Sequence, residues 1–313
     1  MGFRIHRRPA TRLGRCWPLS ELHPGITEHR FDTGTVALNY AEGPPNGPPL
    51  ILLHGLGRRW QVFLPLIPAL SMRWHIFAPD LRGHGKSGRV PQSYECVAYA
   101  EDVARFVRGC VREPAVVFGH SLGGMIGMSI ACHHPDFVRG LILGDNILVA
   151  RPAGSAGLRN PMYAALFNGL RELARRGGTL ESIADGIGRI SLPVPGTDES
   201  IEIRFLPGND EAYLLSWARC VQQADAAVYD MTLDGSALNN WDGRSLLAGI
   251  SCPTLLLQAT PELGGLMSDA DVALATSLLA HHTHVRFRSL GHALFIQQPD
   301  PVLRAVTNFL ESL

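Results

Sequence analysis

The most reactive pattern in this chain is the sequence Gly-His-Ser-Leu-Gly at residues 119–123. β-branched and apolar residues precede it at 115–118, and small or apolar residues that suit a helix follow it at 125–131. Strand, sharp turn and helix form the setting in which a serine is exposed as a nucleophile. Such a turn strains the serine backbone, so the residues two positions away on either side must be small. The pattern predicts Ser121 as a nucleophile, although a glycine-rich turn without chemistry would have the same sequence.

A serine hydroxyl attacks an acyl carbon only when a base removes its proton and N–H groups stabilise the resulting oxyanion. We expect one N–H at Leu122, directly after the nucleophile and at the positive end of the following helix. The second is expected at Leu56, in the His-Gly-Leu-Gly loop that ends the apolar run 50–53. His292 is the predicted base, because it lies directly after the last expected strand and follows the serine in the chain.

Two rival motifs are incomplete. A Gly-Lys-Ser sequence at 85–87 resembles the end of a phosphate-binding loop, but Asp80 occupies the position that requires glycine. A Gly-Leu-Gly sequence at 55–57 begins a dinucleotide fingerprint, but Trp60 occupies its third glycine position. Neither nucleotide site is therefore supported, and no cofactor is expected.

Composition narrows the remaining function classes. The chain carries 28 basic and 28 acidic side chains, so no global field attracts nucleic acid. No apolar run approaches the roughly 18 residues of a membrane span. The six cysteines are scattered without a Cys-x-x-Cys pair, which indicates reduced thiols and a cytoplasmic location. We expect a small-molecule substrate and neither a nucleic-acid nor a membrane partner; the sequence leaves the oligomeric state open.

Two histidine clusters resemble parts of a metal site. They lie at His133–His134 and within 281–284. Neither has a carboxylate or a cysteine at a spacing that would complete a ligand set. We therefore predict no metal.

The elements that would position the reactive residues alternate between strands and helices. Segments 28–32 and 35–40 are expected to pair antiparallel and open a sheet. Continuous apolar runs then predict buried strands at 50–53, 75–80, 115–118, 140–143, 254–258 and 284–287, with a helix over about 97–112. This order indicates a mostly parallel sheet flanked by helices, which binds ligands at the carboxyl ends of its strands.

The chain divides into three regions. We expect a loosely ordered arm at 1–27, an α/β core at 28–145 and 251–313, and a helical lid inserted at 146–250. The lid segment breaks the strand–helix alternation and carries scattered aromatic residues. Trp60, Met125 and His120, together with lid aromatics, are the expected walls of a substrate pocket.

Four motifs in order resemble the α/β-hydrolase fold family from about residue 28 onward. They are His-Gly-Leu-Gly at 54–57, Asp-Leu-Arg-Gly-His-Gly-Lys-Ser at 80–87, Gly-His-Ser-Leu-Gly-Gly at 119–124 and Gly-His at 291–292. The resemblance implies a sheet of about eight strands and a metal-free Ser–His–acid mechanism. Ser121 argues against the haloalkane dehalogenase and epoxide hydrolase branches, which attack with a carboxylate.

The acid departs from the family pattern. The resemblance places an aspartate after the penultimate strand, where this chain has Ala-Thr-Pro-Glu at 259–262. Glu262 could orient a histidine, although it is one methylene longer. Asp145, at the end of the preceding strand, is the alternative acid. The sequence favours Glu262 and leaves Asp145 open.

These residues predict a serine hydrolase that cleaves a small or medium apolar ester, thioester or lactone through an acyl-enzyme. The same triad could serve a C–C bond hydrolase, a perhydrolase or a lyase, because one fold hosts all of these reactions. A ligand receptor of the same fold with negligible turnover is a further alternative.

Overall fold

The computed structural model describes residues 25–149, 160–194 and 197–313. Most of the predicted arm at 1–27 lies outside the described residues. A sheet of eight strands has the order β1-β2-β4-β3-β5-β6-β9-β10. The strands are β1 (Thr27–Asp32), β2 (Ala37–Glu42), β3 (Pro49–Leu53), β4 (His75–Pro79), β5 (Ala115–His120), β6 (Val138–Gly144), β9 (Thr254–Gln258) and β10 (His282–Arg286).

The sheet is antiparallel at one edge and parallel elsewhere. β1 pairs antiparallel with β2, and β2 pairs antiparallel with β4. Every other neighbouring pair is parallel, from β4–β3 to β9–β10. The predicted mostly parallel, roughly eight-stranded sheet is confirmed, as is the antiparallel pair that opens it.

Alternating side chains of the buried strands enter two separate cores. Ile51 and Leu53 of β3 belong to one cluster, whereas Leu50 and Leu52 belong to the other. Successive side chains of a strand point to opposite faces, so a strand covered on both faces must be apolar throughout. This is why the strands appear in the sequence as continuous apolar runs.

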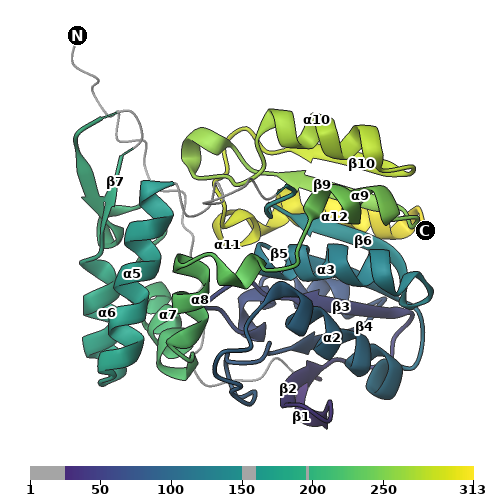
Figure 1. Cartoon of the computed structure of the whole chain (residues 1–313), viewed down its shortest axis with the longest axis horizontal. Helices are drawn as coiled ribbons and strands as arrows, with labels where there is room; N and C mark the ends of the chain where they lie inside the picture. The colour runs from purple at the N-terminus through teal and green to yellow at the C-terminus, as the bar shows by residue number, and fades with distance from the viewer. Residues whose placement is uncertain (1–24, 150–159, 195–196) are drawn as a thin grey trace.

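Helices cover both faces of the sheet (Figure 1). One core contains side chains of α2 (Cys96–Phe106), α3 (Leu122–His133), α9 (Gly243–Gly249) and α10 (Asp269–Leu278). The other contains side chains of α1 (Ile67–Leu70), α11 (Leu294–Gln297) and α12 (Pro299–Glu311). Among the described residues, no helix is both long and apolar enough to cross a membrane.

Most of the described residues between β6 and β9 are helical. This segment contains α5 (Pro161–Arg176), α6 (Leu180–Gly188), α7 (Glu211–Gln223), α8 (Ala227–Leu233) and α9, with a small hairpin of β7 (Ser191–Pro193) and β8 (Ser200–Glu202). α5, α6 and α7 form a group beside the sheet (Figure 1). Asn160, Thr179 and Asp210 begin these three helices, because each side chain accepts a backbone N–H of the first turn. The hairpin was not predicted from the sequence.

Candidate active site

The turn at Ser121 has the strained geometry that its glycine spacing predicts. Ser121 follows β5 directly and adopts φ 54° and ψ −119°, after which α3 begins. A Cβ atom at Gly119 would lie 2.1 Å from the Gly123 carbonyl oxygen, and one at Gly123 would lie 2.1 Å from the Leu53 carbonyl oxygen. Both positions therefore require glycine. The side chain of Ser121 is only partly buried.

His292 and Asp145 form a hydrogen-bonded pair. His292 Nδ1 lies 2.8 Å from Asp145 Oδ2. Asp145 follows β6, has φ 45° and is fully buried. With Nδ1 engaged by a carboxylate, His292 carries its proton there and keeps Nε2 free to accept another. The pair can therefore act as a base with an oriented ring.

Backbone N–H groups of the loop after β9 hold the same carboxylate. Asp145 Oδ1 accepts from Ala259 at 3.1 Å and from Met267 at 3.3 Å, and Oδ2 accepts from Leu266 at 2.9 Å. Burial alone would raise the pKa of Asp145, but the bonds from His292 and this loop outweigh burial and lower the pKa. The carboxylate is therefore ionised.

The preference for Glu262 as the partner of His292 is corrected. Glu262 lies in the 3-10 turn η6 (Pro261–Leu263) and its side chain is exposed. The carboxylate that contacts His292 belongs to Asp145. The loop that carries Glu262 contributes backbone donors to that carboxylate instead, because β6 and β9 are adjacent and end at the same edge of the sheet.

His120 supports the backbone of His292. Its Nε2 lies 2.8 Å from the His292 carbonyl oxygen, and the two rings are 4.7 Å apart. Burial, and then the charge of His292, lower the pKa of His120 to about 3, so its ring is neutral and donates from Nε2. The buried ring packs against His292, and the contact of His120 with a substrate remains a prediction.

Two further buried histidines fix the loop that carries Leu56. His54 Nδ1 bonds the Gly55 carbonyl oxygen at 2.8 Å, while His54 Nε2 accepts the Leu81 N–H. Because a trans peptide is planar, holding the Gly55 carbonyl directs the Leu56 N–H the opposite way. His84 Nε2 accepts the Gly57 N–H at 3.0 Å.

The two expected oxyanion donors remain unengaged in the described part of the chain. Neither the Leu56 nor the Leu122 N–H donates a hydrogen bond to any described residue. Leu122 opens α3, where a first-turn N–H has no intrahelical acceptor. Gly55 lies against the nucleophile, since a Cβ there would be 3.1 Å from Ser121 Cβ. The arrangement suits an oxyanion between the two loops, and the role of both residues remains a prediction.

Trp60 and Met125, both predicted to line the substrate pocket, lie in different cores of the molecule. Trp60 is 1% exposed, packs in the core beside α1, α11 and α12, and donates Nε1 to Glu28 Oε1. Its prediction as a pocket wall is wrong, because η1 (Trp60–Phe63) turns the indole into this core. Met125 is buried in the first turns of α3, in the opposite core. Its contact with a substrate remains a prediction.

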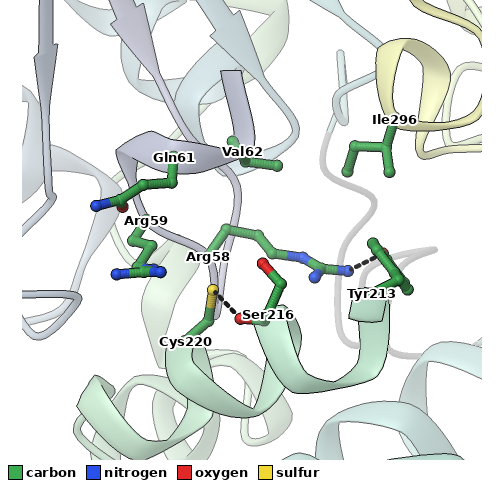
Figure 2. Close-up of a pocket in the computed structure, with 8 residues that line it drawn as sticks. All are labelled: Arg58, Arg59, Gln61, Val62, Tyr213, Ser216, Cys220 and Ile296. Carbon is green, nitrogen blue, oxygen red and sulfur yellow. Dashed lines mark hydrogen bonds between the residues drawn. The ribbon is translucent and has the colours of Figure 1, made fainter. Parts of the chain in front are cut away.

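A pocket that the sequence did not indicate opens beside these loops. It is a small, partly open hollow with a cavity volume of about 30 Å³. It lies between η1, α7 and α11 (Figure 2). Its lining residues are Arg58, Arg59, Gln61, Val62, Tyr213, Ser216, Cys220 and Ile296. The one feature of the sequence that could have indicated this pocket is the arginine directly after the predicted oxyanion loop.

Among the described residues, no group of three potential ligands is placed to hold a metal ion.

Comparison with known proteins decides the family. A profile described as the alpha/beta hydrolase fold matches residues 48–299. The chain belongs to the alpha/beta hydrolase fold family. The resemblance inferred from the four motifs is therefore confirmed.

Similar proteins include hydrolytic enzymes. The chain is 38% identical over 116 residues to a 2-(acetamidomethylene)succinate hydrolase of Mesorhizobium japonicum, a match that spans 37% of this chain and only 41% of that protein. It is 27% identical to a pimeloyl-[acyl-carrier protein] methyl ester esterase of Edwardsiella ictaluri, over 84% of this chain and 93% of the esterase. The crystal structure of E-2-(acetamidomethylene)succinate hydrolase superposes with a TM-score of 0.69 at 25% identity, covering 91% of this chain and 99% of that one. The expected relationship to hydrolytic enzymes is confirmed.

Proposed function

We propose that this member of the family is a serine hydrolase that cleaves an ester, thioester or lactone through an acyl-enzyme at Ser121. The observation that carries the proposal is the buried, ionised Asp145 bonded to His292. The carbonyl oxygen of His292 accepts a hydrogen bond from His120, the residue directly before the strained serine. A carboxylate, an imidazole and a hydroxyl in this order are the parts that acyl transfer requires.

Each group has a defined part in the reaction. His292 Nε2 takes the proton of Ser121 as its oxygen attacks the carbonyl carbon, and later gives it to the leaving group. Asp145 stabilises the imidazolium that forms. The Leu56 and Leu122 N–H groups bind the oxyanion of the tetrahedral intermediate. A water molecule, activated by His292 in the same way, then releases the acyl group from Ser121.

The relatives support the coarse reaction class. One is named as a methyl ester esterase and matches over most of its length, and another is named as a hydrolase of an acetamidomethylene compound. We place this chain in the same class, acting on a small molecule in the cytoplasm. The helical segment at 146–250 serves as a lid, since its helices contribute side chains to the pocket and pack against the site: Tyr163 of α5 lies 5.7 Å from the His292 ring.

Labelling with a fluorophosphonate, followed by peptide mapping, tests the nucleophile. We expect one adduct, on Ser121, that is absent in Ser121→Ala. Short-chain ester, thioester and lactone substrates should be turned over by the wild-type chain and not by this variant. Labelling elsewhere, or turnover that persists in Ser121→Ala, would refute the proposal. A single acylation without sustained turnover would indicate a receptor of the same fold.

A further inference from the structure

We infer that Arg58 binds a carboxylate carried by the substrate, next to the carbonyl that Ser121 attacks. The inference rests on the proposed function and narrows its substrate class from wholly apolar compounds to acyl compounds with an anionic group. It is drawn from the position of the guanidinium, from its lack of an acidic partner and from the polar atoms around it.

Arg58 lies between the catalytic loops and the helical segment. It follows Leu56 by two residues in the loop whose Gly55 contacts Ser121. Its side chain extends across the pocket towards Tyr213, with Ile296 on the other side of the space (Figure 2). Ile296 belongs to α11, just after His292. The charge of Arg58 contributes to the lowered pKa of His120, after burial and His292, and His120 bonds the backbone of His292.

The guanidinium is held in place without being neutralised. Its carbon lies 3.9 Å from the centre of the Trp217 ring, and its Nη2 donates to Tyr213 Oη at 3.0 Å. Within the described residues it forms no ion pair with a carboxylate. The buried Arg82, in contrast, bonds both oxygens of Asp102, at 2.5 and 2.7 Å. Stacking and one neutral bond orient the planar group and leave other N–H donors for an anion.

Other polar atoms around this arginine also lack partners among the described residues. They are Trp217 Nε1, in the ring against which the guanidinium stacks, and the buried Tyr229 Oη. Arg59 Nε and Gln61 Oε1 also lack partners, but these two side chains point away from the Arg58 guanidinium (Figure 2). Tyr229 is fully buried, and its hydroxyl lies where a Cβ at Gly57 would be only 2.5 Å away. Buried polar groups without a protein partner are costly, so Trp217 Nε1 and Tyr229 Oη can bind a polar group of a ligand.

A carboxylate suits this site best. A guanidinium and a carboxylate match in geometry and form paired charge-assisted hydrogen bonds. The Tyr213 hydroxyl accepts from Arg58 and can donate its own proton to the second oxygen. Arg59 adds positive charge to the same pocket. Because one guanidinium is oriented towards the ligand, we expect the bound group to carry a single negative charge.

Matched esters with and without a carboxylate test the inference. On the acyl side the pair is 4-nitrophenyl hemiglutarate and 4-nitrophenyl pentanoate; on the leaving-group side it is 4-acetoxybenzoate and phenyl acetate. We expect the wild-type chain to prefer the anionic member of at least one pair. Arg58→Met should lower kcat/KM for that ester by about 10- to 100-fold, mainly through KM, and leave the neutral ester within about twofold. Arg58→Lys should restore part of the preference.

Arg176→Met is the matched control, because it removes the same charge from an exposed position at the end of α5. It should leave the preference unchanged. Equal kcat/KM for both members of each pair, or an equal loss for both in Arg58→Met, would overturn the inference while Ser121 labelling still supports the hydrolase. Glutarate should also raise the Tm of the wild-type chain and of Ser121→Ala but not of Arg58→Met. This binding test does not depend on turnover, and equal shifts in all three would overturn the inference even if the proposed reaction fails.

Discussion

The carboxyl ends of β6 and β9 lie side by side and make different contributions to the site. Gly144 of β6 pairs with Leu257 of β9, and the Asp145 N–H continues the pairing to the Leu257 carbonyl at 3.0 Å. The end of β6 contributes the carboxylate of Asp145, whereas the loop after β9 contributes the backbone N–H groups that hold it. The two strand ends are adjacent, so the order of motifs alone does not decide which of them carries the carboxylate that contacts His292.

Asp145→Asn tests this difference with the largest expected effect. The variant keeps the shape of the side chain but removes the charge and allows the wrong histidine tautomer. We expect kcat for ester hydrolysis to fall on the order of 10³- to 10⁴-fold. Steady-state kinetics on a 4-nitrophenyl ester measures it, with circular dichroism to show that the variant folds.

Glu262→Gln is the matched control at the other strand end. Its side chain is exposed, so kcat should stay within about twofold of the wild-type value. The opposite ranking of the two variants would transfer the acid role to the β9 loop and contradict the account.

His120→Phe tests whether the hydrogen bond from His120 to the His292 carbonyl oxygen positions His292, and its expected effect is smaller. Phenylalanine keeps a ring against His292 but cannot donate to its carbonyl oxygen. A displaced base lowers the rate without removing any reacting group, so we expect kcat to fall by about 10- to 100-fold. His133→Phe, an exposed position at the end of α3, should leave kcat unchanged. A kcat near the wild-type value in His120→Phe would show that this bond does not position His292.

The free energy of unfolding should depend on pH in two ranges. One range reflects the buried histidines that hold the loops, and the other reflects Asp145. Burial lowers the pKa of His84 to about 4 and that of His120 to about 3, from an ordinary 6.5. The unfolded chain therefore binds more protons below about pH 6.5, and the free energy of unfolding should fall as the pH drops towards 4. The lowered pKa of Asp145 acts in the same direction, but only below its ordinary value of 3.8.

Urea unfolding at a series of pH values measures the free energy of unfolding above and below about pH 4. His84→Gln can still accept the Gly57 N–H without titrating, so it should lessen the loss between pH 6.5 and 4. Asp145→Asn should alter the profile only at lower pH. Identical profiles for His84→Gln and the wild-type chain would contradict this assignment.

Tyr163→Phe has the smallest expected effect and tests the anchoring of the β9 loop. The buried Tyr163 hydroxyl donates to the Gly264 carbonyl oxygen at 2.6 Å, joining α5 to the loop that surrounds Asp145. Losing this bond should lower the free energy of unfolding by about 1 kcal/mol and change kcat by no more than a few-fold. A loss of kcat as large as that of Asp145→Asn would mean that the loop, rather than the carboxylate, controls the site.

Local patterns in the sequence were sufficient to predict the strands of the sheet and the turn at Ser121. Buried strands appear as apolar runs because both faces of the sheet are covered. Glycine is required at 119 by contacts with residues 123 and 124, and at 123 by a contact with the adjacent strand. The turn at Ser121 was predictable for that reason.

The acid and the pocket were not predictable, because both depend on packing between distant segments. The bonds from Ala259 and Leu266 to Asp145 span more than a hundred residues of sequence. Trp60 faces a core and Arg58 faces the pocket, although only one residue separates them in the chain. The direction in which each side chain points depends on the backbone path of the loop into η1. The type of the side chain does not specify that path.

The most direct test of the account is the ¹H NMR signal of the His292 Nδ1 proton, read in the far-downfield region where strongly hydrogen-bonded imidazole protons resonate. We expect this signal in the wild-type chain and in Glu262→Gln, and its loss or a large upfield shift in Asp145→Asn. His292→Gln assigns the resonance by removing it. A signal that persists unchanged in Asp145→Asn, or that disappears in Glu262→Gln, would contradict the assignment of the carboxylate behind His292.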